Sequence, residues 1–121
     1  RYRAMKKWRA APTEENLWGV VQAYAGAQFK TWSGLGFSYQ LRRGRNGEFT
    51  RELWIDRRAQ SKSLAWSSVM LALGKVPGGE KPVVQRPKDL GDIRGISYIY
   101  AMFYRFGIID VPEKVKAKMG R

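Results

Sequence analysis

Residues 37–56 read FSYQLRRGRNGEFTRELWID, and this stretch decides the fold. Its two halves alternate apolar and polar side chains, a pattern that predicts two strands, each with one buried face. The tripeptide Arg45-Asn46-Gly47 stands between them and is typical of a tight hairpin turn. We therefore expect an antiparallel β-hairpin here. The apolar positions expected to share a face are Phe37, Tyr39 and Leu41 in the first strand, and Phe49, Leu53 and Ile55 in the second.

The length of the turn determines which side chains of the hairpin face the core. A two-residue Asn-Gly loop would put Leu53 and Ile55 on the polar face of the first strand. A three-residue loop instead pairs Phe37 with Ile55 and leaves one face apolar. In the same register Tyr39 pairs with Leu53, and Gly47 takes the left-handed conformation that glycine tolerates best. We predict the three-residue loop, whose opposite face presents Ser38, Gln40, Arg42, Thr50, Glu52 and Trp54.

Helical patterns flank the hairpin on both sides. Apolar residues spaced three and four apart predict helices with a buried stripe, and the capping residues at their ends predict where they begin and stop. Residues 77–91 form a long connection with three prolines. The expected helices are one opened by Pro12 or Thr13 and ending near Phe29, one at residues 64–73 capped by Ser61-Lys62-Ser63, one capped by Asp89 or Asp92 and ending at Gly107, and a short tail helix from Val111 through Lys118.

These elements predict a small α+β fold in a single domain, residues 11–121, preceded by a basic arm at residues 1–10. The two-stranded antiparallel hairpin lies between helices in the order α-β-β-α-α, and the chain ends in the basic tail helix. One alternative stays open at residues 97–100. Ile and Tyr dominate this short stretch, which would also suit a strand.

The composition excludes several classes of function. The chain contains no Cys and no His, which removes disulfides, zinc sites with Cys or His ligands, thiol catalysis and Ser-His-Asp catalysis. No segment approaches the roughly 20 apolar residues of a membrane helix, and no apolar signal-peptide core follows the basic N-terminus. We therefore expect a soluble protein without a membrane partner, in a reducing, cytoplasmic setting, with the nucleoid or nucleus included.

A strong positive charge indicates a polyanionic partner. Lys and Arg total 23 against 10 Asp and Glu, which gives a net charge of +13. The hairpin is rich in Arg, whose guanidinium group binds phosphate and guanine edges as a two-pronged fork. A two-stranded ribbon also fits the major groove of duplex DNA. We predict binding of nucleic acid, with double-stranded DNA favoured over RNA, through Arg42, Arg43, Arg45, Trp54, Arg57, Arg58, Ser61, Lys62, Ser63 and the basic termini.

Two members of this set have a purely structural alternative. Ser61-Lys62-Ser63 stands at an expected helix start, where amides, hydroxyls and cations would converge on a phosphate group. The same tripeptide equally suits an ordinary helix cap. Trp54 is the one large apolar side chain on the polar face of the hairpin, and it suits base stacking. Its alternative is cover from the N-terminal arm or a terminal helix.

The carboxylates of the second strand are the candidates for catalysis. Glu48, Glu52 and Asp56 are evenly spaced, so they would share a face and could hold Mg²⁺ for phosphodiester cleavage. Each has arginine neighbours, and ion pairing with those arginines is the interpretation we prefer. We expect a protein that is not an enzyme and holds no metal or other cofactor. The alternative function is a protein-interaction module of a larger assembly, with its basic tails contacting an acidic partner.

Overall fold

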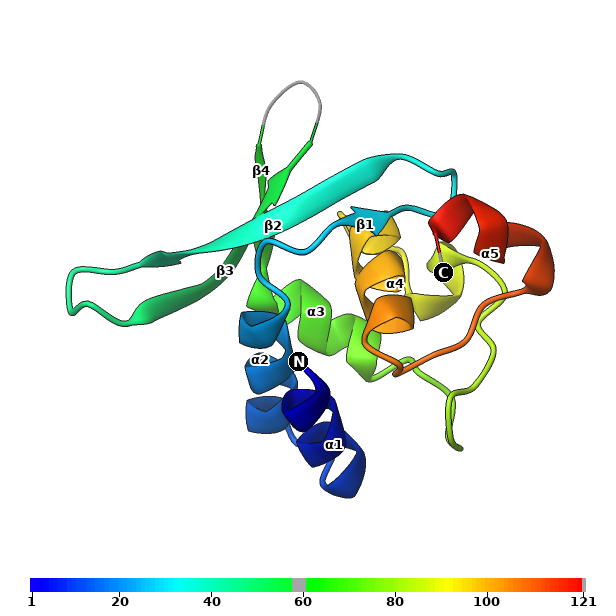
Figure 1. Cartoon of the computed structure of the whole chain (residues 1–121), viewed down its shortest axis with the longest axis horizontal. Coiled ribbons are helices and arrows are strands. Elements are labelled where there is room, and N and C mark those ends of the chain that lie inside the picture. The colour runs from blue at the N-terminus through cyan, green and yellow to red at the C-terminus, as the bar shows by residue number, and fades with distance from the viewer. Residues whose placement is uncertain (58–60, 121) are drawn as a thin grey trace.

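A four-stranded antiparallel sheet and five α-helices make up the described residues, 1–57 and 61–120, of the computed structural model (Figure 1). The predicted α+β class is confirmed. The predicted order α-β-β-α-α is wrong in detail, because the sheet has two further strands. The elements are α1 (Tyr2–Ala10), α2 (Glu14–Ala23), β1 (Phe29–Lys30), β2 (Gly36–Arg43), β3 (Phe49–Asp56), β4 (Lys62–Ala65), α3 (Trp66–Leu73), the 3-10 helix η1 (Pro87–Leu90), α4 (Ile96–Arg105) and α5 (Glu113–Met119).

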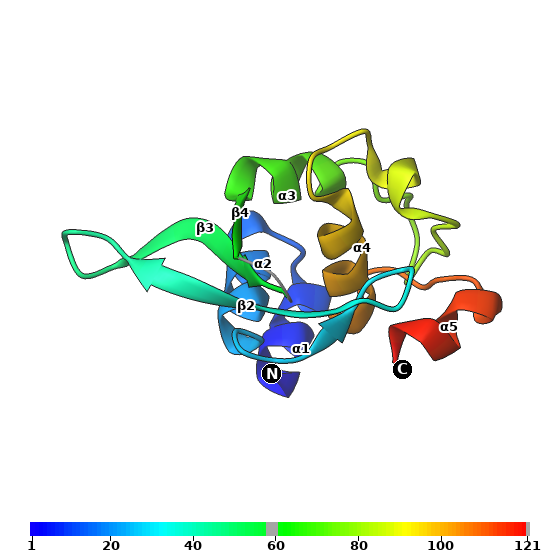
Figure 2. The ribbon, with the colours of Figure 1, turned by 90° about the horizontal axis from the view of Figure 1, so that it is seen from above.

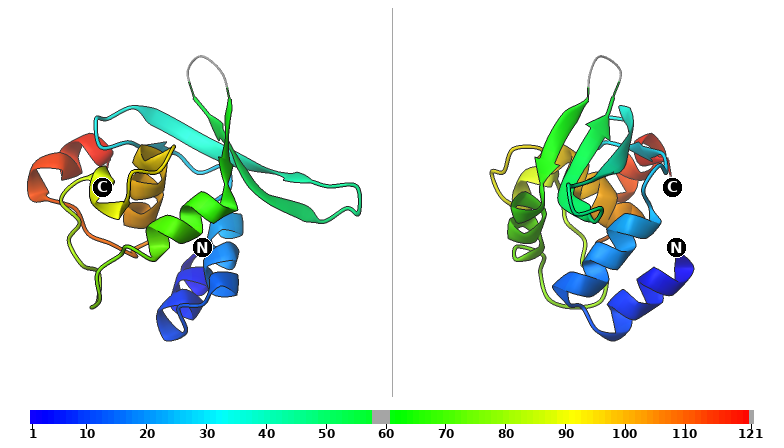
Figure 3. Two further views of the ribbon diagram at one scale, coloured as in Figure 1. Left: turned by 180° about the vertical axis from the view of Figure 1, so that it is seen from behind. Right: turned by 90° about the vertical axis from the view of Figure 1, so that its left-hand side faces the viewer.

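The sheet has one covered face and one open face. Its strands lie in the order β1-β2-β3-β4, so β1 and β4 form the edges. Helices α2, α3 and α4 lie on one side of it (Figures 1 and 3). Across the described part of the chain, no helix covers the other side, which we call the outer face. The outer face carries Ser38, Gln40 and Arg42 of β2, Glu52, Trp54 and Asp56 of β3, and Ser63 and Ala65 of β4.

The predicted three-residue loop of the hairpin is confirmed. The Gly44 N–H donates to the Glu48 carbonyl over 2.8 Å and so closes the last pair before the turn. The Gly47 N–H donates back to the Gly44 carbonyl over 3.0 Å, and Gly47 has φ +82°. This is a tight turn followed by a left-handed glycine, the geometry that fits the twist of a hairpin with three loop residues. The Arg45-Asn46-Gly47 signal therefore predicts the turn correctly.

The predicted pairing farther along the hairpin is wrong by two residues. Tyr39 pairs with Ile55 rather than with Leu53, and Leu53 pairs with Leu41 instead. The reason is an irregularity between Leu41 and Arg43, where residues 50–52 of β3 lie opposite one residue of β2. A shift of two keeps the alternation of faces intact, because side chains alternate with a period of two. The predicted buried set is accordingly confirmed: Phe37, Tyr39, Leu53 and Ile55 are all at most 2% exposed.

Strand β4 replaces the expected cap at Ser61-Lys62-Ser63. Residues Lys62–Ala65 pair with β3, and helix α3 begins only at Trp66, with Ala65 at its N-cap position and no side-chain cap. Leu64 is buried and its strand neighbours are not, which is the alternation of an edge strand. The hydrogen bonds of the β3–β4 ladder occupy the backbone that a helix start would have used.

Helix α2 starts as predicted and ends earlier than predicted. The Thr13 hydroxyl accepts the Asn16 N–H over 3.2 Å, which is the expected N-cap. The helix stops at Ala23, and Phe29 belongs to β1 instead. Gly26 explains the early stop, because it has φ +85° and its N–H donates to the Tyr39 carbonyl over 2.9 Å. The chain turns there to join the sheet.

The predicted basic arm is a helix packed on α2. Helix α1 buries Trp8 and is joined to α2 through Asn16, whose side-chain amide donates to the Ala11 carbonyl over 2.7 Å. The Arg1 guanidinium donates to the Ala23 carbonyl over 3.2 Å. Figures 1 and 3 place α1 on the side of α2 away from the strands. The arm and the sheet therefore lie at opposite ends of the helical layer.

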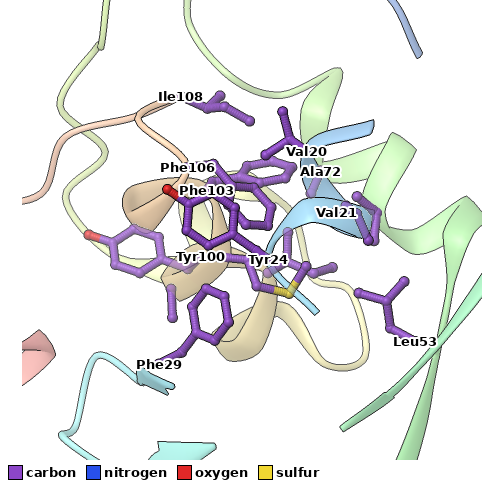
Figure 4. Close-up of a cluster of buried hydrophobic side chains, with 14 of the residues drawn as sticks. Val20, Val21, Tyr24, Phe29, Leu53, Ala72, Tyr100, Phe103, Phe106 and Ile108 are labelled. Atoms are coloured by element: carbon purple, nitrogen blue, oxygen red, sulfur yellow. The ribbon is translucent and has the colours of Figure 1, made fainter. Parts of the chain in front are cut away.

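Helix α4 fills the centre of the core. Residues 97–100 are helical, so the strand alternative is wrong, and Gly95 rather than Asp89 or Asp92 occupies the N-cap position. The helix ends at Arg105, two residues before Gly107, which has φ +80°. Figure 4 shows Tyr100 and Phe103 of α4 in one cluster with Tyr24, Phe29 and Phe106. The ring centroids of Tyr24 and Phe106 lie 5.0 Å apart.

The C-terminal segment closes the structure. Helix α5 lies beside β1, close to the predicted tail helix in extent. The chain before it forms an isolated parallel bridge between Val83 and Asp110, so the proline-rich connection is attached to the end of the core. Within residues 1–57 and 61–120, no helix is long and apolar enough to cross a membrane.

Replacing Gly47 should destabilise the hairpin through backbone strain alone. No atom lies within 4 Å of a Cβ added there, but φ is +82°. We expect Gly47→Val to lower the free energy of unfolding by about 1–2 kcal/mol, because a β-branched residue is forced into the left-handed region. Urea unfolding measures this. Gly78→Val is the matched control, since Gly78 also has open space and no positive φ. An equal loss in both variants would contradict the turn geometry.

Asp110 should make the free energy of unfolding depend on pH in the acidic range. Its carboxylate accepts the Val111 N–H over 2.9 Å and lies 3.3 Å from the Lys116 ammonium. These two groups hold the pKa of Asp110 below its ordinary value of 3.8. The lowered pKa means that the unfolded chain binds the proton more readily, so the stabilisation is present above the ordinary value and is lost as the pH falls through the folded pKa.

Comparing Asp110→Asn with the wild type tests this dependence. We expect the difference in unfolding free energy between them to shrink between about pH 6 and about pH 3, because protonation removes the same interaction that the substitution removes. The control is Asp92→Asn, since Asp92 is exposed and has no ion pair within the described residues. A pH-independent difference would show that the Asp110 contacts contribute nothing.

Candidate nucleic-acid interface

The far end of the β2–β3 hairpin projects beyond α2 as a two-stranded ribbon (Figures 1 and 2). We call residues 42–50 of this ribbon the hairpin tip. Arg42 and Arg43 end β2 and Arg45 lies in the turn, and all three are exposed. The structure therefore brings three of the predicted arginines together on one protruding element.

Arg42 stacks on Trp54 across the outer face. Its guanidinium carbon lies 3.7 Å from the centroid of the indole ring. Contacts of this kind contribute about 0.5–1 kcal/mol at exposed sites. Trp54 is half-buried and takes Gln40 and Ser63 as its neighbours on the adjacent strands. The alternative in which the N-terminal arm or a terminal helix covers Trp54 is wrong for α1, which lies beyond α2, and Arg42 covers the ring instead.

Arg43 points to the opposite side of the hairpin and supports the turn. Its guanidinium carbon lies 4.2 Å from the centroid of the Phe49 ring. One of its nitrogens donates to the Gly47 carbonyl over 2.7 Å. The side chain is still exposed, so it remains within reach of a ligand. Arg43 thus holds the shape of the hairpin tip and contributes charge to it.

Arg57 lies away from the hairpin tip, at the other end of β3. It is half-buried and donates to the Tyr98 hydroxyl over 2.8 Å, which joins the end of β3 to α4. Its partner Arg58 in the predicted site lies outside the described residues. The predicted convergence of Arg57 with Ser61-Lys62-Ser63 on a helix start does not occur, because that tripeptide leads into β4.

The β4 residues of the predicted site lie one strand away from Trp54. Ser63 is the cross-strand neighbour of Trp54 on the outer face, and Lys62 is opposite Ile55. Ser61 and Ser63 are exposed, and Lys62 is half-buried. Ser63 therefore belongs to the same face as the Arg42–Trp54 stack.

The predicted ion pairs of the β3 carboxylates are absent from the described residues. Arg51 instead turns towards α2, where its guanidinium lies 2.6 Å from a Glu15 oxygen and 3.5 Å from Glu14. The cause is the alternation of β3, which places Arg51 on the same face as Leu53 and Ile55 and so beside α2. In the same part of the chain, no group of three or more acidic side chains is placed to hold a metal ion.

The cations of the hairpin tip therefore lack acidic partners. Among residues 1–57 and 61–120, every ion pair involves Arg51, Arg86 or Lys116. Arg42, Arg43 and Arg45 contact an indole ring, a phenyl ring, a backbone carbonyl or solvent, none of which carries a neutralising charge. Uncompensated positive charge on a projecting element attracts an anionic ligand over a distance of about one Debye length, roughly 8–10 Å.

Two residues near this surface lie outside the predicted site. Tyr98 is the partner that fixes Arg57, and Arg94 lies beside β4, where it lines a pocket with Lys62, Ser63 and Ser68. Neither has a local signal, because each comes from the α4 region, far along the chain from β3 and β4. Only the packing of α4 against the sheet brings them there.

The Arg42–Trp54 contact should appear as a coupling energy. In a double-mutant cycle of Arg42→Met and Trp54→Leu, with stability measured by urea unfolding, we expect a coupling energy of about 0.5–1 kcal/mol. The cycle of Arg43→Met with Trp54→Leu is the matched control and should give a value near zero, since Arg43 contacts Phe49 on the other side. Equal couplings in the two cycles would mean that Arg42 is not held by the indole ring.

Comparison with known proteins places no relative beside this chain. No protein-family model, no curated protein and no solved structure matches it.

Proposed function

We propose that this chain is a non-catalytic nucleic-acid-binding domain that prefers double-stranded DNA over RNA. The observation that carries the proposal is the hairpin tip, where Arg42, Arg43 and Arg45 project on a ribbon without any acidic partner in the described residues. The net charge of +13 supports the same partner.

The shape of the hairpin tip favours duplex DNA. Two paired strands are about 4.7–4.9 Å apart, and the major groove of B-DNA is about 12 Å wide, so a ribbon with its side chains enters it. The major groove of duplex RNA is deep and narrow and does not admit such a ribbon. A ribbon braced by its own turn contacts also loses little conformational freedom on binding.

The arginines of the hairpin tip have different roles in this proposal. The guanidinium of Arg42 lies over the Trp54 ring, so its fork is positioned before binding and suits a guanine edge. Arg45 is exposed in the turn and reaches either a base or a phosphate. Arg43 supports the turn and contacts a phosphate with its exposed part.

The basic termini act at a distance in this proposal. Helix α1 lies beyond α2, and α5 lies at the β1 edge, so neither adjoins the hairpin tip (Figure 1). Their lysines and arginines raise the positive potential of the whole molecule, which accelerates encounter with a polyanion. A nucleic-acid partner also implies an intracellular location. The absence of cysteine, and so of disulfides, agrees with that location.

Binding titrations with hairpin and tail variants test the proposal. We expect Arg42→Ala and Arg45→Ala each to weaken binding of a short duplex, by about 1–3 kcal/mol where the arginine reads a base edge. The matched control is Lys114→Ala with Lys118→Ala, two exposed lysines of α5 that have no ion pair in the described residues. The control should keep most of the affinity.

The dependence on salt separates this proposal from the alternative of an acidic protein partner. For duplex DNA, the logarithm of the binding constant should fall with the logarithm of salt concentration, by about 0.9 per phosphate contacted. If only the tail variant loses affinity for the duplex and the hairpin variants bind as the wild type does, the hairpin tip is not part of the interface. Failure to bind any nucleic acid at low salt would leave the protein-interaction module as the function.

A further inference from the structure

A pocket of about 330 Å³ lies at the free edge of β4. Its polar lining comes from three separate elements: Lys62 and Ser63 of β4, Ser68 of α3 and Arg94 of the segment before α4. The remaining lining residues are Leu64 and Ala65, and none of the six is acidic. The pocket therefore combines two cations with two hydroxyl groups.

The position of Arg94 is set by a close backbone approach. Gly95, the next residue, has φ +83°, and a Cβ added to it would lie 2.7 Å from a methyl carbon of Leu64. Glycine suits this left-handed conformation best, and any larger residue would require the Leu64 side chain to move, so the turn before α4 lies against the Leu64 side chain of β4. That contact places Arg94 in the lining of the same pocket as Lys62. The pairing of the two cations is thus built into the packing of α4 on the sheet.

The pocket matches the chemistry of a phosphate group. Neither Lys62 nor Arg94 forms an ion pair with any described residue, and Arg94 is exposed. Two cations that line one pocket repel each other, and an anion bound between them offsets that repulsion. Hydroxyl groups such as those of Ser63 and Ser68 commonly donate to phosphate oxygens, and the arginine fork binds two of them at once.

We propose that this pocket binds a backbone phosphate of the nucleic acid that the hairpin tip engages. The inference rests on the proposed function. Ser63 is the direct cross-strand neighbour of Trp54, and adjacent strands are about 4.7–4.9 Å apart, so the pocket adjoins the Arg42–Trp54 stack on the outer face. The nucleic acid then runs from the hairpin tip across the outer face to the β4 edge, and Arg94 and Lys62 neutralise a phosphate there.

The first test measures the salt dependence of duplex binding. Fluorescence anisotropy follows a labelled short duplex between about 50 and about 200 mM salt for the wild type, Arg94→Gln, Arg94→Lys and Arg3→Gln. Arg94→Gln should reduce the slope by about 0.9, because one phosphate contact is lost. Arg94→Lys keeps the charge and should keep the slope. Arg3→Gln is the matched control: it removes the same charge from exposed α1, away from the sheet, and should leave the slope unchanged.

The second test uses inorganic phosphate as the probe. In a nuclear magnetic resonance titration, phosphate should shift the backbone amide signals of Ser63 and Ser68 in the wild type. The same shifts should be absent in Arg94→Gln, whose melting temperature checks that the fold is intact. Signals of α1 serve as the internal control, because α1 lies beyond α2.

The outcomes separate the pocket from the proposed function. If the wild type binds duplex with a steep salt slope and Arg94→Gln behaves like Arg3→Gln, the pocket assignment is overturned and the function stands. If the wild type binds neither duplex nor RNA, the proposed function fails. The nucleic-acid assignment of the pocket then fails with it, even where inorganic phosphate still shifts the two serine amides.

Discussion

The buried side chain of Tyr39 joins the sheet to the helical layer, and the rest of the structure depends on that junction. Tyr39 is fully buried, and its hydroxyl donates to the Val21 carbonyl of α2 over 2.6 Å. Burial raises the pKa of Tyr39, so the phenol remains a donor throughout the ordinary pH range. The carbonyl of the same residue accepts the Gly26 N–H over 2.9 Å, beyond the end of α2. One residue of β2 thus holds both α2 and the chain that leaves it, which keeps the inner face of the hairpin against the core.

The hairpin supplies both core and surface because its inner face is covered along only part of its length. Leu53 and Ile55 are fully buried near the helices. Beyond the irregular pairing at residues 50–52, Phe49 still packs against the core, and contacts between the two strands give further support. The hydrogen bond from the Thr50 hydroxyl to the Arg42 carbonyl and the stacking of Arg43 on Phe49 provide that support. A projecting ribbon braced in this way presents its side chains in a set geometry, which suits a groove.

The arginines of the hairpin region divide into two groups that composition alone does not separate. Arg51 is neutralised by Glu15 and lies 5.0 Å from the centroid of the Trp18 ring, so it attaches β3 to α2. Arg57 donates a hydrogen bond to the Tyr98 hydroxyl. Arg42, by contrast, is oriented by an uncharged ring and keeps its full charge. Whether a cation is available to a ligand is therefore decided by what lies across the strand or the helix layer from it.

The sequence by itself determined the α+β class, the turn at Gly47, the face of the hairpin that is buried, and the cap of α2 at Thr13. Each depends on neighbours within a few positions, where alternation, backbone conformation and capping chemistry act directly. The tertiary structure alone decided the two-residue shift in register, the edge strands β1 and β4, and the placement of Arg94 in one pocket with Lys62. Short edge strands have too few residues to carry a pattern, and they form because a neighbouring strand supplies hydrogen-bond partners. The pocket at β4 exists because Gly95 and Leu64, distant in sequence, pack in contact, and no local signal encodes such a contact.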